Sequence, residues 1–333
     1  MRIIFFEKLI LLTLLFITLN KNIGPKPHCC VAADRYIPLP RYTMKEIIIT
    51  KAELNLNKEI DRKFLHKKIT VDHMDRVLDE TEYNFKGDAI HRITYRYSTF
   101  DNISETIEFD ASNNLIERQL YSEDENGEIT SSTTEYGNGA KTTKKFQFTD
   151  LGNADKATLI DENGNVIGYE TYILDSDERI VSEFESDENH NELSRIDRKF
   201  NDSGEILRET HFSEGEIDEI TSNHYRNGQL VKIQRSKNLE SIVSTEVREF
   251  DSKNRIIKRT TNYHEYSDVE IEFSEYDNND NVVSNMVEVN GRMIFTNVCK
   301  YDKENRLLEE YIMELNLNGS INAHERVFYA YKD

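Results

Sequence analysis

Four acidic turns offer oxygen-rich side chains of the kind that bind calcium ions. A helix-loop-helix calcium site needs an Asp five positions before its Gly, but Ser122 and Leu159 occupy that position in two of the turns. The Gly-rich nonapeptide calcium repeat is also missing from the sequence. We therefore expect solvated hairpin turns and no metal site. The four turns are Asp124–Gly127, Asp161–Asn165, Asp175–Glu178 and Asp277–Asp280.

The nine histidines form no zinc-type pair, and no Gly-x-Ser-x-Gly elbow or phosphate-binding glycine loop is present. Carboxylates are so abundant that a catalytic pair cannot be identified from the sequence unless the distances between the carboxyl groups are known. His211 and His224 are expected on neighbouring strands in different registers, so a shared ligand stays open beside a structural or surface role. We predict no enzyme activity, no catalytic or metal-binding residue and no cofactor, and the binding residues stay unknown.

The elements that must position these residues come from a repeat of 25 to 26 residues. Its nine-residue motif is an aromatic residue, Asp or Asn, two polar residues, Asn or Gly, a polar residue and an aliphatic pair. The clearest copies are FDSKNRIIK from Phe250, YDNNDNVVS from Tyr276 and YDKENRLLE from Tyr301. The ten copies start at residues 71, 97, 121, 148, 174, 200, 225, 250, 276 and 301.

Each repeat combines two turns with two strand-like segments. Asp251 to Asn254 are turn formers, and Arg255 to Tyr263 is rich in β-branched residues. Val269, Ile271 and Phe273 then alternate with glutamates and a serine, which gives one apolar face and one wet face. A second turn, such as the one at Gly164, divides every copy. We predict an all-β, antiparallel meander of about ten two-stranded repeats, as an open twisted sheet or a curled β-repeat shell.

The repeated aromatic residues allow two interpretations. An exposed ladder of tyrosines could bind sugars or a peptide, whereas a packed ladder would cover the apolar face and set the strand register. We expect the packed ladder, whose members are Tyr97, Tyr121, Phe148, Phe200, Tyr225, Phe250, Tyr276 and Tyr301.

The charge of the chain excludes one class of partner. The formal net charge is −20, and the acidic excess lies within residues 81–333. Such a surface repels phosphate backbones, so we expect no nucleic-acid binding. Anionic membranes are disfavoured for the same reason, and membrane contact is expected only through residues 1–33, if they are not cleaved.

The N-terminal residues are typical of a signal peptide. Leu9 to Leu19 is an apolar run too short to span a membrane, and Val31 to Ala33 offers small residues at a cleavage site. An uncleaved anchor and lipidation at Cys29 or Cys30 are alternatives. We predict a signal peptide at 1–33, an N-terminal capping segment at 34–70 and a β-hairpin repeat domain at 71–333, with Cys299 as a lone buried thiol.

The motif resembles the YD repeats of the Rhs family of bacterial secreted and surface proteins. Phe250-Asp251 with Asn254-Arg255-Ile256 is a close copy, as are the copies from Tyr276 and Tyr301, and the resemblance spans residues 71–333. Membership would imply a sheet of stacked hairpins, sometimes wrapped into a shell around a toxin.

These observations lead to one predicted function and two alternatives. We predict a non-catalytic scaffold, secreted, periplasmic or at the cell surface, that binds a protein or glycan partner. A structural or toxin-delivery-related envelope protein is the first alternative. A hydrolase with a site in an irregular repeat, near Gly139 or Gly215, is the second.

Overall fold

The computed structural model describes residues 44–148, 154–237, 239 and 241–332. The expected signal peptide and the Cys29–Cys30 pair lie outside these residues. The described residues form 22 strands and no helix. The first eleven are β1 (Lys45–Leu54), β2 (Ile60–Val71), β3 (Val77–Tyr83), β4 (Ala89–Tyr97), β5 (Ile103–Asp110), β6 (Leu115–Glu123), β7 (Ile129–Tyr136), β8 (Lys141–Phe148), β9 (Ala154–Asp161), β10 (Val166–Leu174) and β11 (Ile180–Asp187). The others are β12 (Glu192–Phe200), β13 (Ile206–Ser213), β14 (Glu216–Arg226), β15 (Gln229–Lys237), β16 (Ser241–Phe250), β17 (Ile256–Tyr263), β18 (Asp268–Tyr276), β19 (Val282–Val289), β20 (Arg292–Tyr301), β21 (Leu307–Leu315) and β22 (Ile321–Lys332).

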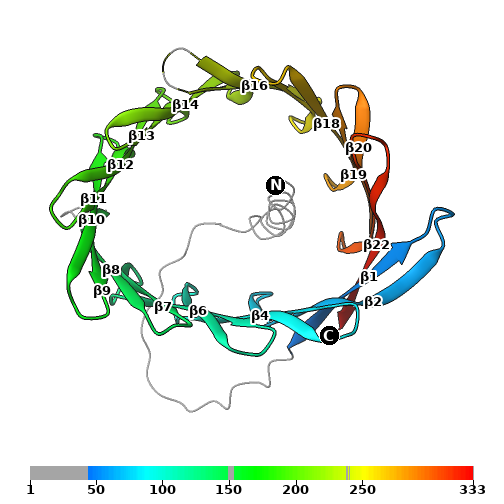
Figure 1. Cartoon of the computed structure of the whole chain (residues 1–333), viewed down its shortest axis with the longest axis horizontal. Coiled ribbons are helices and arrows are strands. Elements are labelled where there is room, and N and C mark those ends of the chain that lie inside the picture. Colours follow the sequence, from blue (N-terminus) through cyan, green and yellow to red (C-terminus); the bar gives the residue numbers. More distant parts are fainter. Residues whose placement is uncertain (1–43, 149–153, 238, 240, 333) are drawn as a thin grey trace, which may run out of the picture. The chain divides into compact units, whose positions relative to one another are not determined.

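The strands form one closed antiparallel barrel (Figure 1). Each strand pairs with the next along the chain, and β1 pairs with β22 from Glu46 opposite Lys332 to Glu53 opposite Glu325. The expected all-β fold is confirmed, but the open sheet or shell of ten repeats is wrong. Residues 34–70, expected to cap the repeats, hold β1 and nearly all of β2. Closure is favoured because the outermost strands would otherwise each leave a row of backbone groups unpaired.

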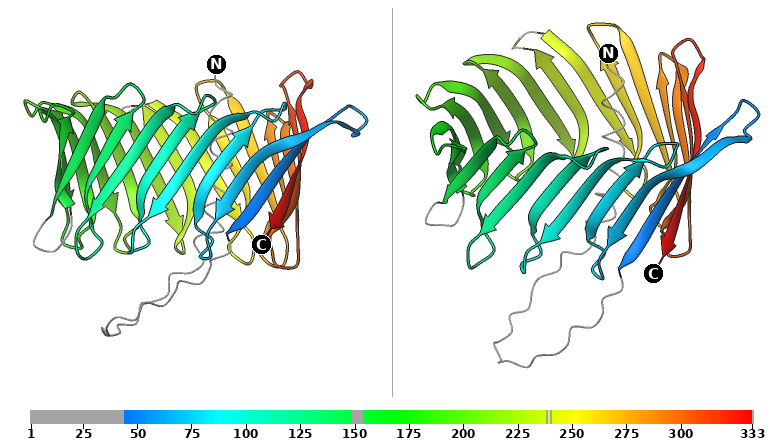
Figure 2. Two further views of the ribbon diagram at one scale, coloured as in Figure 1. Left: turned by 90° about the horizontal axis from the view of Figure 1, so that it is seen from below. Right: turned by 60° about the horizontal axis from the view of Figure 1, so that its bottom comes forward.

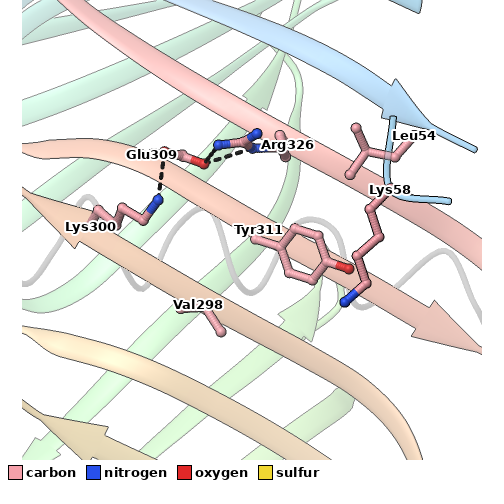
Figure 3. A pocket seen from close by; sticks show the side chains of 7 residues that line it. All are labelled: Leu54, Lys58, Val298, Lys300, Glu309, Tyr311 and Arg326. Carbon is pink, nitrogen blue, oxygen red and sulfur yellow. Dashed lines mark hydrogen bonds and ion pairs between the residues drawn. The ribbon is translucent and has the colours of Figure 1, made fainter. Parts of the chain in front are cut away.

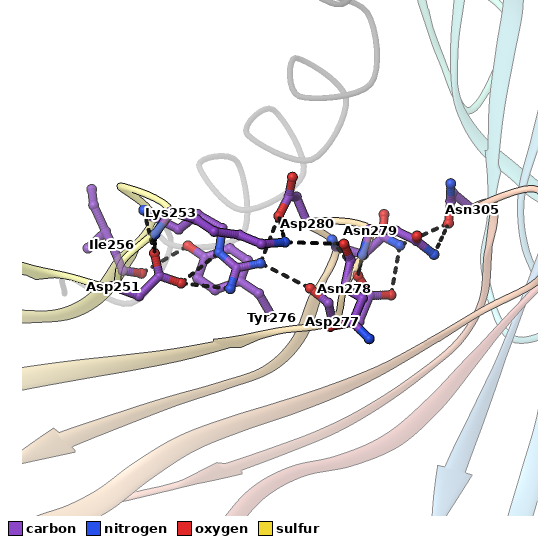
Figure 4. A network of polar contacts seen from close by, with 11 residues as sticks. Asp251, Lys253, Ile256, Tyr276, Asp277, Asn278, Asn279, Asp280 and Asn305 are labelled. Atoms are coloured by element: carbon purple, nitrogen blue, oxygen red, sulfur yellow. Dashed lines mark hydrogen bonds and ion pairs between the residues drawn. The ribbon is translucent and has the colours of Figure 1, made fainter.

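The Asp of the motif organises the turn in copies that carry it, as the copy from Phe250 shows (Figure 4). Asp251 Oδ1 accepts hydrogen bonds from the backbone amides of Lys253 and Arg255 at 2.8 and 3.0 Å, and its Oδ2 accepts one from Arg255 Nε at 2.7 Å. The bond from the Arg255 amide and then that from its side chain lower the pKa of Asp251. Asn254 adopts a left-handed backbone with φ of 65°, which explains the Asn or Gly at this position.

The aromatic residue links each copy to the one before it. The Arg255 guanidinium lies 4.6 Å from the centroid of the Tyr276 ring, and the Tyr276 hydroxyl donates a 2.9 Å hydrogen bond to the Ile256 carbonyl. The tyrosines that make this bond hold neighbouring hairpins in register, whereas Phe148 of the expected ladder is 38% exposed. The same hydroxyl-to-carbonyl bond joins Tyr97 to Val77, Tyr225 to Ile206, Tyr301 to Val282 and Tyr331 to Leu307.

Polar bonds also join the motif turns into a belt along one rim, which we call the motif rim. Lys253 Nζ donates to the Asn278 carbonyl and to Asp280, and Asn279 Nδ2 donates to Asn305 at 2.9 Å (Figure 4). Each of these bonds spans about one repeat, so the turns that make them support their neighbours. Similar bonds connect Arg76 with Asp101 and Asn102 with Gly127.

The compact apolar core lies at the seam where the barrel closes. Ile49, Ile69, Val71 and Val327 form a buried cluster on β1, β2 and β22. Elsewhere the wall is a single layer, and no large side chain of the described residues is fully buried. Closure of the barrel is thus supported by both hydrogen bonds and apolar packing.

Replacing Glu214 with Asn is expected to stabilise the protein. Glu214 holds a left-handed position of its turn with φ of 51°, where Asn is tolerated far better than Glu. Relief of this strain should raise the free energy of unfolding by about 1 kcal/mol in a urea titration. The reverse change, Asn254→Glu, should lower it by a similar amount, and equal stability of both variants would contradict this explanation.

A disulfide should form across the seam in the double variant Ile48→Cys, Ala330→Cys, made without the three native cysteines. These residues are directly opposite on β1 and β22, so their Cα atoms lie within the range that a disulfide spans. Mass spectrometry after oxidation should show an intramolecular cross-link. Ile48→Cys combined with Ser222→Cys on β14 should give none, and free thiols in the first variant would argue for an open sheet.

Candidate functional site

The two sides of the barrel wall are identified from strands β20 to β22. In Figure 3 the side chains of Lys300, Glu309 and Arg326 stand in front of these strands, and the opposite part of the barrel lies behind them. They therefore point outward. Because side chains alternate along a strand, Cys299, Glu310 and Val327 point inward. The cross-strand register extends this assignment around the barrel and defines an inner wall and an outer wall.

The barrel is too wide for its inner side chains to fill. The strands are inclined to the barrel axis (Figure 2), and 22 strands at the usual spacing and tilt give a backbone radius of about 20 Å. Side chains fill barrels of about eight strands, whereas 16 to 18 strands already leave an aqueous channel. The inner wall is therefore a large concave surface that its own side chains leave accessible to a ligand.

Pairs of glutamates lie directly opposite each other on the inner wall. Three such pairs connect neighbouring strands, and like charges in this position destabilise a sheet. Some of these carboxylates already have partners, since Lys51 Nζ lies 2.7 Å from Glu325, Lys144 forms an ion pair with Glu170, and His91 Nε2 lies 2.7 Å from Glu108. The pairs are Glu53 with Glu325, Glu108 with Glu117 and Glu170 with Glu185.

Several inner carboxylates have no ion pair with any described residue. Glu117 receives a hydrogen bond only from Gln119, at 2.7 Å, and Glu185 one from Ser194, at 2.9 Å. Neutral donors of this kind leave the negative charge uncompensated. The carboxylates without an ion pair include Glu117 on β6, Glu185 on β11, Glu219 on β14 and Glu270 on β18.

Glu270 shows the electrostatic consequence most clearly. It lies in a row across β16 to β18, because Glu246 is opposite Thr261 and Thr261 is opposite Glu270. Burial raises the pKa of Glu270, and the neighbouring charges of Glu272 and Glu246 raise it further. Glu246 is held by Arg248 at 2.6 Å and Glu272 by Arg259 at 2.7 Å, so only Glu270 lacks a cation in this row.

Many carboxylates on the outer wall are neutralised. Glu105 pairs with Arg96 and Arg118, and Glu249 pairs with Lys258 at 2.9 Å. Glu309 likewise holds two cations. Glu275 and Glu288 on the outer wall have no ion pair with a described residue, so both walls keep some uncompensated negative charge.

The aspartates of the acidic turns bond the backbone of their own turns. Asp124 Oδ1 accepts the backbone amides of Asn126 and Glu128, and Asp277 Oδ1 accepts those of Asn279 and Asn281. Their oxygens are used to close the turns. Within the part of the chain that the structure describes, no group of three or more His, Cys, Asp or Glu could hold a metal ion.

The structure separates the remaining candidate residues. His211 lies on the inner wall, where it contacts Glu209 at 2.7 Å, whereas His224 lies on the outer wall and cannot share its ligand. Cys299 is buried as expected, and burial together with Glu310 raises the pKa of its thiol to about 12. The repeated tyrosines lie on the inner wall near the motif rim, where arginine side chains cover rings such as those of Tyr97 and Tyr276.

Sequence reasoning missed the inner carboxylates as a group. The alternation of Glu270 and Glu272 with Val269, Ile271 and Phe273 was visible, but the direction in which each face points was not. In the barrel the glutamates point inward and the apolar residues outward. A period-two pattern with glutamates at the same phase in several repeats was the available signal.

Neither a family model nor a curated protein matches this sequence. Similar solved structures include TcdB2–TccC3–Cdc42, with 11% identity, a TM-score of 0.36 and coverage of 84% of this chain and 19% of that chain. A porin-like protein from Bacteroides uniformis has 11% identity, a TM-score of 0.27 and coverage of 87% and 98%. This chain therefore spans about a fifth of the TcdB2–TccC3 chain, and TM-scores this low carry no conclusion about function. Membership of the YD-repeat family stays a prediction.

No helix among the described residues is long and apolar enough to cross a membrane.

The variant Glu270→Gln is expected to be more stable than the native protein at neutral pH. A carboxyl group whose pKa is raised on folding disfavours the folded state when ionised, so Gln removes an unfavourable charge. The melting temperature should rise by a small amount, on the order of 1 °C. This gain in melting temperature should shrink as the pH falls through the raised pKa of Glu270. It should vanish below the ordinary value of 4.5, where the carboxyl group is protonated in both the folded and the unfolded protein.

Thermal melts of both proteins across this pH range provide the measurement. Glu249→Gln on the outer wall, which removes the partner of Lys258, is the control and should give no gain. A gain for Glu270→Gln that persists unchanged in acid would contradict the electrostatic explanation.

Proposed function

We propose that the protein is a non-catalytic scaffold in the cell envelope or outside the cell, and that its inner wall binds a positively charged segment of a protein partner. The observation that carries this proposal is the set of inner-wall carboxylates without a cation. The position outside the cytoplasm rests on the signal-like residues 1–33 and on the motif's resemblance to YD repeats of secreted and surface proteins.

The electrostatics of the inner wall support a cationic ligand. Glu185 lies opposite Glu170, which Lys144 already neutralises, and Glu185 itself has no ion pair with a described residue. A Lys or Arg of a ligand placed beside Glu185 would therefore reduce the repulsion between the two carboxylates. A concave wall that carries an excess of negative charge also attracts an oppositely charged segment from a distance. On the outer wall, Glu105 and Glu309 each already hold two cations and offer less attraction.

The dimensions of the barrel support a polypeptide as the ligand. An α-helix with its side chains is about 10–12 Å across, which is well below the diameter given by a radius of about 20 Å. A glycan has weaker support on the inner wall, because Arg255 and Arg76 cover the rings of Tyr276 and Tyr97 that would stack on sugars. The hydrolase alternative has no comparable support, since the turns at Gly139 and Gly215 are tight hairpin turns.

A short fluorescent peptide rich in Lys and Arg should bind the full chain at low salt, and fluorescence anisotropy measures its affinity. Replacing four of the unpaired inner glutamates with Gln should weaken binding about tenfold, since each exposed ion pair contributes about 0.2–1 kcal/mol. Added salt should weaken binding to the native protein more than to this variant. The four changes are Glu117→Gln, Glu185→Gln, Glu219→Gln and Glu270→Gln.

A matched variant separates the inner wall from net charge. It carries the same number of substitutions on the outer wall and loses the same charge, so it should bind the peptide like the native protein. Equal weakening in both variants would show that the peptide responds to net charge alone and would contradict the proposal. The outer changes are Glu46→Gln, Glu249→Gln, Glu275→Gln and Glu288→Gln.

A further inference from the structure

A separate pocket of about 320 Å³ lies on the outer wall beside the seam (Figure 3). The turn between β1 and β2 contributes one side of it, and strands β20, β21 and β22 contribute the floor. Its volume falls at the lower end of the range of small-molecule sites. The lining residues are Leu54, Lys58, Val298, Lys300, Glu309, Tyr311 and Arg326.

Cations outnumber anions around this pocket. Glu309 holds Lys300 at 3.1 Å and accepts a 2.7 Å hydrogen bond from Arg326 Nε, which places both cations along one side. Lys58 forms no ion pair with a described residue, and its Nζ lies 5.8 Å from the centroid of the Tyr311 ring. The lining therefore holds three cations and one carboxylate, on a protein whose formal net charge is −20.

The pocket also has a fixed aromatic surface. The Tyr311 hydroxyl and His324 Nε2 are 2.5 Å apart, and the two rings pack edge to face with centroids 5.3 Å apart. These contacts hold the orientation of the Tyr311 ring. Leu54 and Val298 extend the apolar area, and Val298 is 42% exposed. An apolar floor with cations at its edges, of which Lys58 has no ion pair with a described residue, matches a ring-shaped ligand that carries an anionic group.

We propose that this pocket binds a carboxylated sugar of the uronic-acid type. The apolar face of the pyranose ring lies against Tyr311 and Val298, and its carboxylate pairs with the ammonium of Lys58. The hydroxyl groups of the sugar remain toward solvent, where an open pocket leaves them hydrated. This site is independent of the inner wall, because its lining residues belong to the outer wall and the β1–β2 turn.

Saturation-transfer difference NMR with the full chain tests the ligand class. Glucuronate should receive magnetisation from the protein, and glucose at the same concentration should receive much less because it lacks the carboxylate. Benzoate shares the ring and the carboxylate but not the hydroxyl groups. Binding of benzoate without glucuronate would overturn the sugar assignment, and equal signals from glucose and glucuronate would overturn the role of the cations.

Two lysine variants test the position of the site. Lys58 has a left-handed backbone with φ of 65°, so Lys58→Asn removes the charge while keeping a residue that tolerates this conformation. Its affinity for glucuronate should fall about two- to fivefold, the effect of one exposed ion pair. Lys86→Asn is the matched control, since Lys86 Nζ lies 5.7 Å from the Phe85 ring centroid but does not line the pocket. An unchanged affinity in Lys58→Asn, or an equal loss in Lys86→Asn, would overturn the proposal.

Discussion

The contact between a motif turn and the aromatic residue of the next copy is the interaction on which the barrel depends. Asp251 closes its own turn and orients Arg255, Arg255 covers Tyr276, and Tyr276 donates its hydroxyl to the Ile256 carbonyl. Each copy thereby fixes the position of its successor. Because the contact is repeated, a small constant offset between hairpins accumulates around the barrel until the first and last strands meet.

Closure has a further consequence for the distribution of charge. A single-layer barrel of this width has two wet walls instead of one buried and one exposed face, so its side chains are only partly covered on either side. Ion pairs such as Glu249 with Lys258 neutralise much of the outer wall. Unpaired carboxylates such as Glu270 lie on the inner wall, where curvature brings their charges closer together. Closure thus assigns each acidic side chain of the strands either to the inner wall or to the outer wall.

Local structure was predictable from the sequence in detail. The turn at Asp251 to Asn254 and the strand that follows it were expected from residue types, because hydrogen bonds within a few residues decide them. The ten predicted repeats give fewer strands than the barrel contains. The reason is that β1 and β2 lack a clear copy of the motif, although they complete the sheet. The candidate site was not predictable, since Glu270 and Val269 look equally suited to either side of a sheet.

The sequence by itself determined the strands, the turns and the packing of aromatic rings, because each is satisfied within one repeat or between two neighbours. Only the tertiary structure decided that β1 pairs with β22, which requires the ends of the repeat array to meet. Closure then decided which face is concave and placed Glu117, Glu185, Glu219 and Glu270 on one wall. It also brought Lys58 beside Tyr311, residues far apart in the chain. These features depend on the summed twist and curvature of 22 strands, which no single repeat encodes.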